Sequence, residues 1–143
     1  MRTVSSCRVA IVVAVLIFLV SFTMTSAAQT VTDARAKKMK NPVAADAKSI
    51  EAGQKIFLTS CAPCHGQAGK GDGPVAANMK EVKPSNLADD KWDHGAADGE
   101  IFATIRDGIG PKFTMKAYKE KVKEGDLWNL VNFIRSIGPR KKS

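Results

Sequence analysis

The most restrictive feature of this chain is the sequence Cys-Ala-Pro-Cys-His at residues 61–65, in which two thiols are separated by two residues and followed directly by a histidine. The chain has 143 residues, which suggests a single domain, and its only other cysteine is Cys7. Three cysteines are too few to form a disulfide framework. The pair must therefore be interpreted through the chemistry of two thiols beside an imidazole.

This spacing is typical of covalent haem attachment. Two thiols so placed reach the two vinyl groups of one porphyrin and form thioethers, while the adjacent imidazole reaches the iron from the same side. The thioethers also prevent loss of the haem from a domain that is too small to bury the whole macrocycle. The motif predicts one covalently bound haem c, attached through Cys61 and Cys64 and ligated by His65.

Three other interpretations of the cysteine pair fit less well. A thioredoxin-like dithiol belongs to a βαβ context, and no strand is indicated before Cys61. A zinc site needs four ligands, and only His94 remains to help. A plain disulfide leaves His65 and the glycine-rich run at 66–73 unexplained.

The apolar pattern predicts an all-α fold of three or four short helices joined by long loops. Helical spacing appears over residues 46–60, then from Asp98 as N-cap to about residue 107, and finally from Gly125 or Asp126 to Gly138. No segment gives a persuasive strand. Such long loops are unusual in a compact domain, and a large buried cofactor would explain what holds them.

The first 28 residues have the pattern of a secretory signal peptide: an early basic residue, an aliphatic run at 9–20 and a small-residue exit at 26–28. Cleavage is expected before Gln29, which removes Cys7. The alternative is a retained membrane anchor, although the run is shorter than the roughly 20 residues that span a bilayer. We therefore expect a periplasmic or otherwise exported protein, membrane-anchored if the leader is retained.

The rest of the chain is predicted to divide into three parts. Residues 29–45 are polar and basic and are interpreted as a flexible arm. Residues 46–139 would form the haem-binding domain, and residues 140–143 a basic tail.

The iron's sixth ligand must come from outside the motif. Candidates are Met39, Met79, His94 and Met115. Met115 is favoured because its loop lies between the last two helices and can fold across the open haem face. The second nitrogen of the ligand histidine also needs a fixed partner, for which we expect the Pro74 carbonyl.

From Gly53 onward the chain resembles class I c-type cytochromes, that is, the monohaem cytochrome c domain. The matching residues are Gly53, Phe57, Cys61-Ala62-Pro63-Cys64-His65-Gly66, Gly69-Lys70-Gly71-Asp72-Gly73-Pro74, Met115 and Leu127-Trp128-Asn129-Leu130-Val131-Asn132-Phe133-Ile134. The resemblance implies a helical cytochrome c fold whose first and last helices cross near Gly53. It also implies His and Met axial ligands and single-electron transfer without substrate chemistry.

The resemblance carries three further implications. Pro74 occupies the place where related domains present a carbonyl to the ligand histidine. Trp92 lies in a loop that in similar proteins packs near the haem edge or a propionate, with ordinary core burial as the alternative. Many relatives have proline after the ligand methionine, whereas Lys116 follows Met115 here, so this loop should be less rigid.

The net charge of +8 bears on the partners. Lysines and arginines gather at 37–40, 112–123 and 140–142, a pattern that either steers an acidic redox protein or is simply a solvated surface. Nucleic acid is disfavoured because the basic residues lack interleaved aromatics.

The chain shows no catalytic dyad, nucleophile elbow or phosphate loop. We therefore expect a monomeric, non-enzymatic electron shuttle between periplasmic or membrane redox proteins. The alternatives are a haem c subunit of a dehydrogenase or oxidase, and a haem sensor or peroxidase-like protein whose distal methionine is labile.

Overall fold

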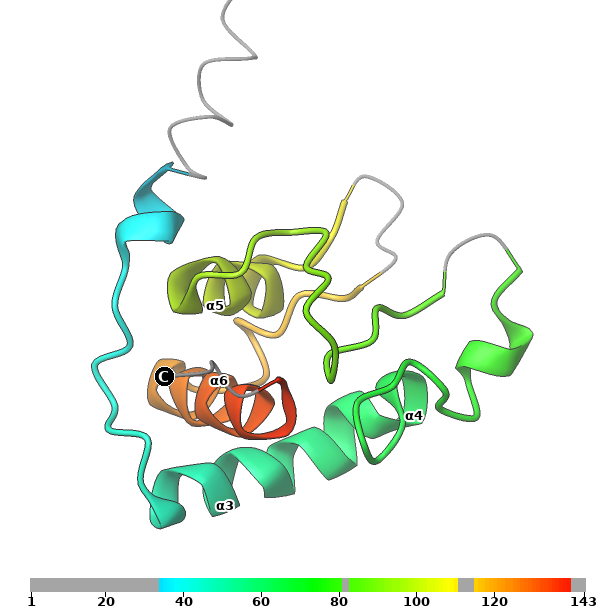
Figure 1. Ribbon diagram of the computed structural model, residues 1–143, viewed down its shortest axis with the longest axis horizontal. Helices are drawn as coiled ribbons and strands as arrows, with labels where there is room; N and C mark the ends of the chain where they lie inside the picture. Colours follow the sequence, from blue (N-terminus) through cyan, green and yellow to red (C-terminus); the bar gives the residue numbers. More distant parts are fainter. Residues whose placement is uncertain (1–33, 81–82, 111–114, 140–143) are drawn as a thin grey trace, which may run out of the picture. The chain divides into compact units, whose positions relative to one another are not determined.

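The computed structural model describes residues 34–80, 83–110 and 115–139 (Figure 1). Its contacts divide the chain into two units, Met1–Arg35 and Ala36–Ser143. The leader expected at 1–28 and the tail expected at 140–143 lie outside the described residues. The second unit carries the haem motif and is described below.

The first helical stretch leads directly into the cysteine motif. Helix α3 spans Ala47–Ile56, and the Asp46 carboxylate caps it by accepting a 2.8 Å hydrogen bond from the Ser49 backbone N–H. The chain continues through the π-helical turn η1, Phe57–Cys61, and the short helix α4, Ala62–His65. The motif therefore lies on helical backbone, which fixes the positions of both cysteines and the histidine relative to α3.

The other helices lie close to their expected positions. The short 3-10 helix η2 spans Ala76–Asn78, α5 spans Asp98–Asp107 and α6 spans Glu124–Ile137. The N-cap of α5 is Ala97 rather than Asp98, and its backbone N–H donates a 2.8 Å hydrogen bond to the Glu100 carboxylate. Within the described ranges, β pairing is limited to an isolated bridge between Ile109 and Met115. The prediction of an all-α fold with a few short helices is confirmed.

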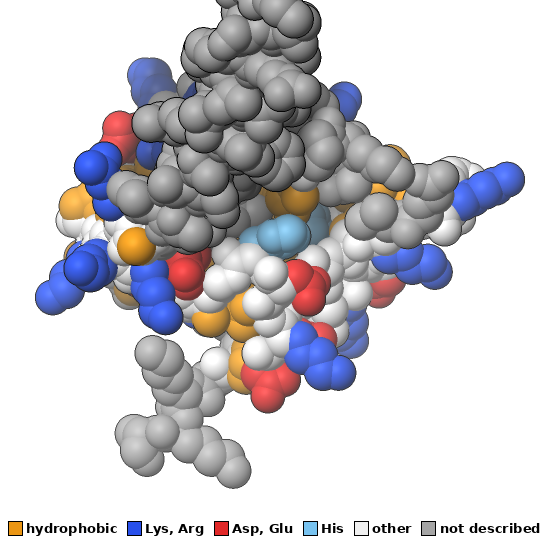
Figure 2. Space-filling view, turned by 90° about the horizontal axis from the view of Figure 1, so that it is seen from above, with side chains coloured by type: hydrophobic (Ala, Val, Ile, Leu, Met, Phe, Trp, Pro, Cys, Tyr) orange, Lys and Arg blue, Asp and Glu red, His pale blue; other side chains and the backbone are white. Residues whose placement is uncertain are grey.

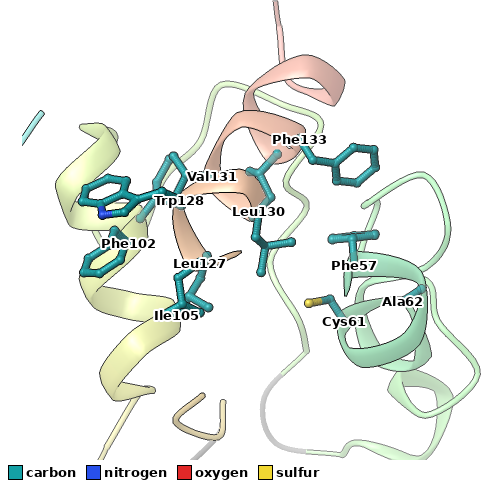
Figure 3. Packing of buried hydrophobic residues seen from close by; sticks show 12 residues of the cluster. Phe57, Cys61, Ala62, Phe102, Ile105, Leu127, Trp128, Leu130, Val131 and Phe133 are labelled. Atoms are coloured by element: carbon teal, nitrogen blue, oxygen red, sulfur yellow. The ribbon is translucent and has the colours of Figure 1, made fainter. Parts of the chain in front are cut away.

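The core forms on both sides of α6 (Figures 1 and 3). On one side Phe102 of α5 stacks on Trp128 with ring centroids 4.0 Å apart, and on the other Phe57 meets Phe133 at 5.0 Å. A Cβ atom added at Gly53 would lie only 2.1 Å from the Asn129 carbonyl oxygen. The expected close crossing of the first and last helices at Gly53 is thus present, and it depends on the missing side chain.

The expectation of a flexible arm at 29–45 is wrong for its second half. Ala36 is buried, and the Asn41 side-chain amide donates hydrogen bonds to the Trp128 carbonyl at 3.2 Å and to Asn132 Oδ1 at 2.8 Å. The compact unit therefore begins at Ala36 instead of residue 46. A polar composition indicates a loop, but it does not exclude a loop that is held by hydrogen bonds to a helix.

Candidate functional site

A cavity of about 640 Å³ lies beside the cysteine motif. This volume falls within the roughly 300–1,000 Å³ range of ligand and cofactor pockets. Much of its wall is apolar and comes from the core: Phe57, Ile101, Ile105, Leu130 and Ile134. The residues on it that carry a sulfur atom or an imidazole are Cys61, Cys64, His65, Met79, His94 and Met115.

Both cysteines of the motif reach this cavity as free thiols. Cys61 is buried, and Figure 3 shows its sulfur pointing away from its own helix toward the space beside α6. Burial, and to a lesser degree the neighbouring Cys64, raises the pKa of the Cys61 thiol to about 12. Cys61 thus presents a neutral thiol to an apolar space, on the side where a macrocycle would lie.

His65 is held in the form that a metal requires. Its Nδ1 lies 3.1 Å from the Ser85 carbonyl oxygen, so Nδ1–H donates and Nε2 is the nitrogen left for a metal. Burial lowers the pKa of His65, and the hydrogen bond to Ser85 opposes that shift only in part. The imidazole is therefore neutral and oriented at neutral pH.

The expectation that the Pro74 carbonyl holds His65 is wrong. Pro74 is exposed and borders a separate shallow groove rather than the cavity. The glycine-rich turn is tied back onto the motif, because Gly73 N–H donates to the Cys64 carbonyl at 3.1 Å. This places Pro74 outside the site, while Ser85, some ten residues later in the chain, supplies the carbonyl. The only sequence signal for it is a second proline, Pro84, directly before Ser85.

Three of the four candidate sixth ligands line the cavity. These are Met79, His94 and Met115, whereas Met39 is exposed and does not line it. Met115 lies in the bridge in which its carbonyl accepts a 2.9 Å hydrogen bond from Ile109 N–H. The loop that follows is fixed by the Tyr118 hydroxyl, which donates to the Ser60 carbonyl at 2.9 Å. This hydrogen bond links the Met115 loop to the turn before Cys61.

Trp92 also lines the cavity and is half-buried. It also packs against the hydrophobic core cluster, so it has a place both in the cavity wall and at the edge of the core.

Cationic side chains surround the cavity. Lys83, Lys91 and Lys116 all contribute to its lining and are exposed, while Asp93 adds one carboxylate. Figure 2 shows histidine beside apolar side chains on one face, with lysine and arginine side chains around the margin of that face. A bound group would thus have a largely cationic rim.

The donor set fits a covalently attached haem. The cavity joins two free thiols and an oriented neutral imidazole on one wall with apolar side chains and a thioether on the others. Within the described residues no group of three or more His, Cys, Asp or Glu side chains is placed to hold a metal ion.

The described helices were also compared with the length of a membrane span. None of them is long and apolar enough to cross a membrane.

Residues 50–138 match the Cytochrome c family, so the chain belongs to this family and carries one covalently bound haem c. It is 30% identical over 99 residues to the cbb3-type cytochrome c oxidase subunit CcoP of Rhodobacter capsulatus, covering 66% of this chain and 31% of that one. It is 29% identical over 93 residues to the subunit FixP of Azorhizobium caulinodans, covering 65% and 29%. The chain therefore spans about a third of the length of these relatives.

A solved structure shows the same fold. It belongs to the reducing HAO-like protein complex of Kuenenia stuttgartiensis and superposes with a TM-score of 0.63 at 24% identity, covering 68% of this chain and 47% of that one. At this identity the likeness concerns the fold alone.

Proposed function

We propose that this protein is a non-enzymatic carrier of single electrons, with haem c attached through Cys61 and Cys64 and ligated by His65 and Met115. One observation carries the proposal: both thiols, the oriented imidazole and the Met115 thioether line the same apolar cavity. When bound, the haem supplies an iron that alternates between its ferrous and ferric states. A His/Met pair raises the potential of that couple.

The chain's own residues would keep the electron transfer simple. The Ser85 carbonyl holds the His65 ring in one orientation, and the Tyr118 hydroxyl fixes the loop after Met115. Both axial positions would then stay filled in both oxidation states, so the site would change geometry little on reduction. Apolar side chains such as Leu130 and Ile134 exclude water from the interior.

The redox partners are expected to be exported or membrane proteins. We propose that residues 1–28 form a cleaved leader and that the protein acts as a periplasmic monomer, or at the membrane if the leader is retained. The cationic rim formed by Lys83, Lys91 and Lys116 suits a partner with an acidic docking surface.

A second candidate function is a haem c subunit within an oxidase or dehydrogenase complex. It is supported by the relatives from Rhodobacter capsulatus and Azorhizobium caulinodans, which are both oxidase subunits. Gentle purification of the tagged protein from its native membranes distinguishes the two. A stoichiometric membrane complex that survives size exclusion supports the subunit, and a free haem protein supports the shuttle.

The attachment is tested by mass spectrometry of protein produced in cells equipped for haem attachment. We expect the polypeptide mass plus one haem, and loss of stable attachment when both cysteines are replaced (Cys61→Ala with Cys64→Ala). Wild-type protein without added haem mass would refute the proposal.

The sixth ligand is tested by the visible spectrum of the oxidised holoprotein. Met115→Ala should abolish the methionine-to-iron charge-transfer band, while Met79→Ala and His94→Ala should retain it. These two are matched controls because both side chains line the same cavity. A band that survives in Met115→Ala would exclude Met115. If wild-type protein lacks the band and binds CO rapidly, the site is open and a sensor or peroxidase-like function is supported instead.

A further inference from the structure

One wall of the cavity is built from chain without regular structure. Residues 83–97 form neither helix nor strand, and five consecutive residues, Lys91 to Gly95, line the cavity. Such a segment has no regular ladder of backbone hydrogen bonds, so its position depends on individual hydrogen bonds, on side-chain contacts and on its two ends.

Arg135 of α6 holds this segment through three contacts. Its Nε lies 2.7 Å from Asp98 Oδ1, and a terminal N–H donates to the Ala96 carbonyl. Its guanidinium carbon lies 5.5 Å from the centroid of the Trp92 ring. A planar guanidinium can satisfy an ion pair, a carbonyl and an aromatic face together, which an ammonium cannot do as well.

The first half of the segment has anchors of its own, because the Ser85 carbonyl accepts from His65 Nδ1 at 3.1 Å and Leu87 N–H donates to the Gly69 carbonyl at 2.6 Å. The other side-chain hydrogen bonds of the segment are local. Ser85 Oγ donates to Asp93 at 3.3 Å, and Ala97 N–H donates to Glu100 at 2.8 Å. Neither contact ties the segment to α6. Among the described residues, the side-chain hydrogen bonds that link residues 92–98 to α6 all come from Arg135.

We infer that Arg135 is a positioning residue that holds Trp92 against the haem pocket and thereby keeps the reduction potential high. The inference rests on the proposed haem site. If the segment loosens, water reaches the iron centre more easily and stabilises the more positive ferric state. The reduction potential then falls, because solvent exposure is one of the levers that set it.

A direct effect of charge can be separated from this positioning role. Arg135→Gln removes a positive charge, and Asp98→Asn removes a negative charge from the same ion pair. Through-space electrostatics alone would lower the potential in the first variant and raise it in the second. Loss of the contacts between Arg135 and residues 92–98 would lower the potential in both variants.

Arg106 provides a matched control. It also pairs with a carboxylate, Asp107, at 2.7 Å, and its guanidinium carbon lies 5.5 Å from the centroid of the Phe102 ring. Neither member of this pair lines the cavity. Arg106→Gln removes the same charge and the same kinds of contact without releasing the cavity wall.

The experiment is a potentiometric titration of the three holoproteins and wild type, together with hydrogen exchange of peptides covering residues 85–98. We expect lower potentials and faster exchange in Arg135→Gln and Asp98→Asn, with Arg106→Gln close to wild type and the methionine band retained throughout. Opposite shifts in the first two variants, or no shift in either, would overturn the positioning role. Neither of those results bears on the proposed haem attachment. That proposal fails only if the mass spectrum of the wild-type protein lacks the added mass of haem.

Discussion

Gly53 is the position where a single methyl group should matter most. A Cβ atom there would lie 2.1 Å from the Asn129 carbonyl oxygen and 2.9 Å from the Phe133 Cβ, and both belong to the helix that crosses α3. Because backbone cannot move aside cheaply, we expect Gly53→Ala to cost about 2–3 kcal/mol of unfolding free energy or more. Guanidinium unfolding of the holoprotein, followed by circular dichroism, measures the change.

Gly125 is the matched control for this substitution. It lies in the first turn of α6, and a Cβ atom added there would meet nothing within 4 Å. Gly125→Ala should be neutral or stabilise the protein by up to about 1 kcal/mol, since alanine restricts the unfolded chain. If both variants lost the same stability, close packing at Gly53 would not be the cause.

The residues that could be predicted from sequence are those whose roles follow from local spacing. The cysteine motif and Gly53 are of this kind. Ser85 is different, because its carbonyl reaches His65 across twenty residues of sequence and any residue type carries a carbonyl. Backbone groups of this sort leave little trace in composition, which is why the sequence alone favours Pro74 and does not indicate Ser85.

At the scale of elements, Asn132 joins the N-terminal segment to α3 and α6. Its buried side-chain nitrogen lies 2.8 Å from Ser49 Oγ and 3.2 Å from the carbonyls of Val43 and Ala44, and its oxygen accepts from Asn41. Asn132→Asp keeps the size but removes the donors. We expect a loss of about 1–3 kcal/mol, because several buried acceptors would then face a carboxylate or lack a partner.

Calorimetry of the Asn132→Asp holoprotein measures this loss as a lower melting temperature. Gln54→Ala is the control, since Gln54 is exposed on α3 and its replacement should change stability by less than about 0.5 kcal/mol. An Asn132→Asp variant as stable as the control would mean that the network does not hold the N-terminal segment in place.

Tyr118 connects the loop of Met115 to the turn that precedes Cys61. Tyr118→Phe keeps the ring and removes the hydroxyl that donates to the Ser60 carbonyl, so we expect a loss of about 1 kcal/mol. The methionine band should also disappear at a lower guanidinium concentration than the helical signal, because the loop is released first. Thr59→Ala removes an exposed hydroxyl and should leave both transitions unchanged. Coincident transitions in Tyr118→Phe would show that the loop is held by other contacts.

The helices were predictable because apolar periodicity and caps act over a few residues. The extent of the compact unit was not predictable, since Asn41 and Asn132 are far apart in sequence. A polar side chain is expected to face solvent unless its hydrogen-bond partner is known. The segment at 83–97 likewise has no hydrophobic periodicity, and its second half is tied to α6 by Arg135, which follows it in the chain by about forty residues.

For the molecule as a whole, the polypeptide keeps a net charge of 20 − 14 = +6 after removal of the leader with Arg2 and Arg8. This charge and the cationic rim predict that electron transfer to an acidic partner slows as salt is added. Charges separated by more than about 8 Å are largely screened at physiological ionic strength. The bimolecular rate constant with an acidic redox protein should therefore fall as ionic strength rises, which stopped-flow kinetics with a purified acidic acceptor measures. A rate independent of salt would indicate that the basic residues form only a solvated surface.

The position of the charge matters as much as its total. Lys91→Glu changes the net charge by the same amount as Lys48→Glu, yet Lys91 lines the cavity and Lys48 lies exposed on α3 without lining it. If the partner docks over the cavity, Lys91→Glu should slow the low-salt reaction by about two- to tenfold, and the difference from wild type should shrink at high salt. Lys48→Glu should have a distinctly smaller effect. Equal effects of the two substitutions would mean that the overall charge guides the encounter without a specific docking surface over the cavity.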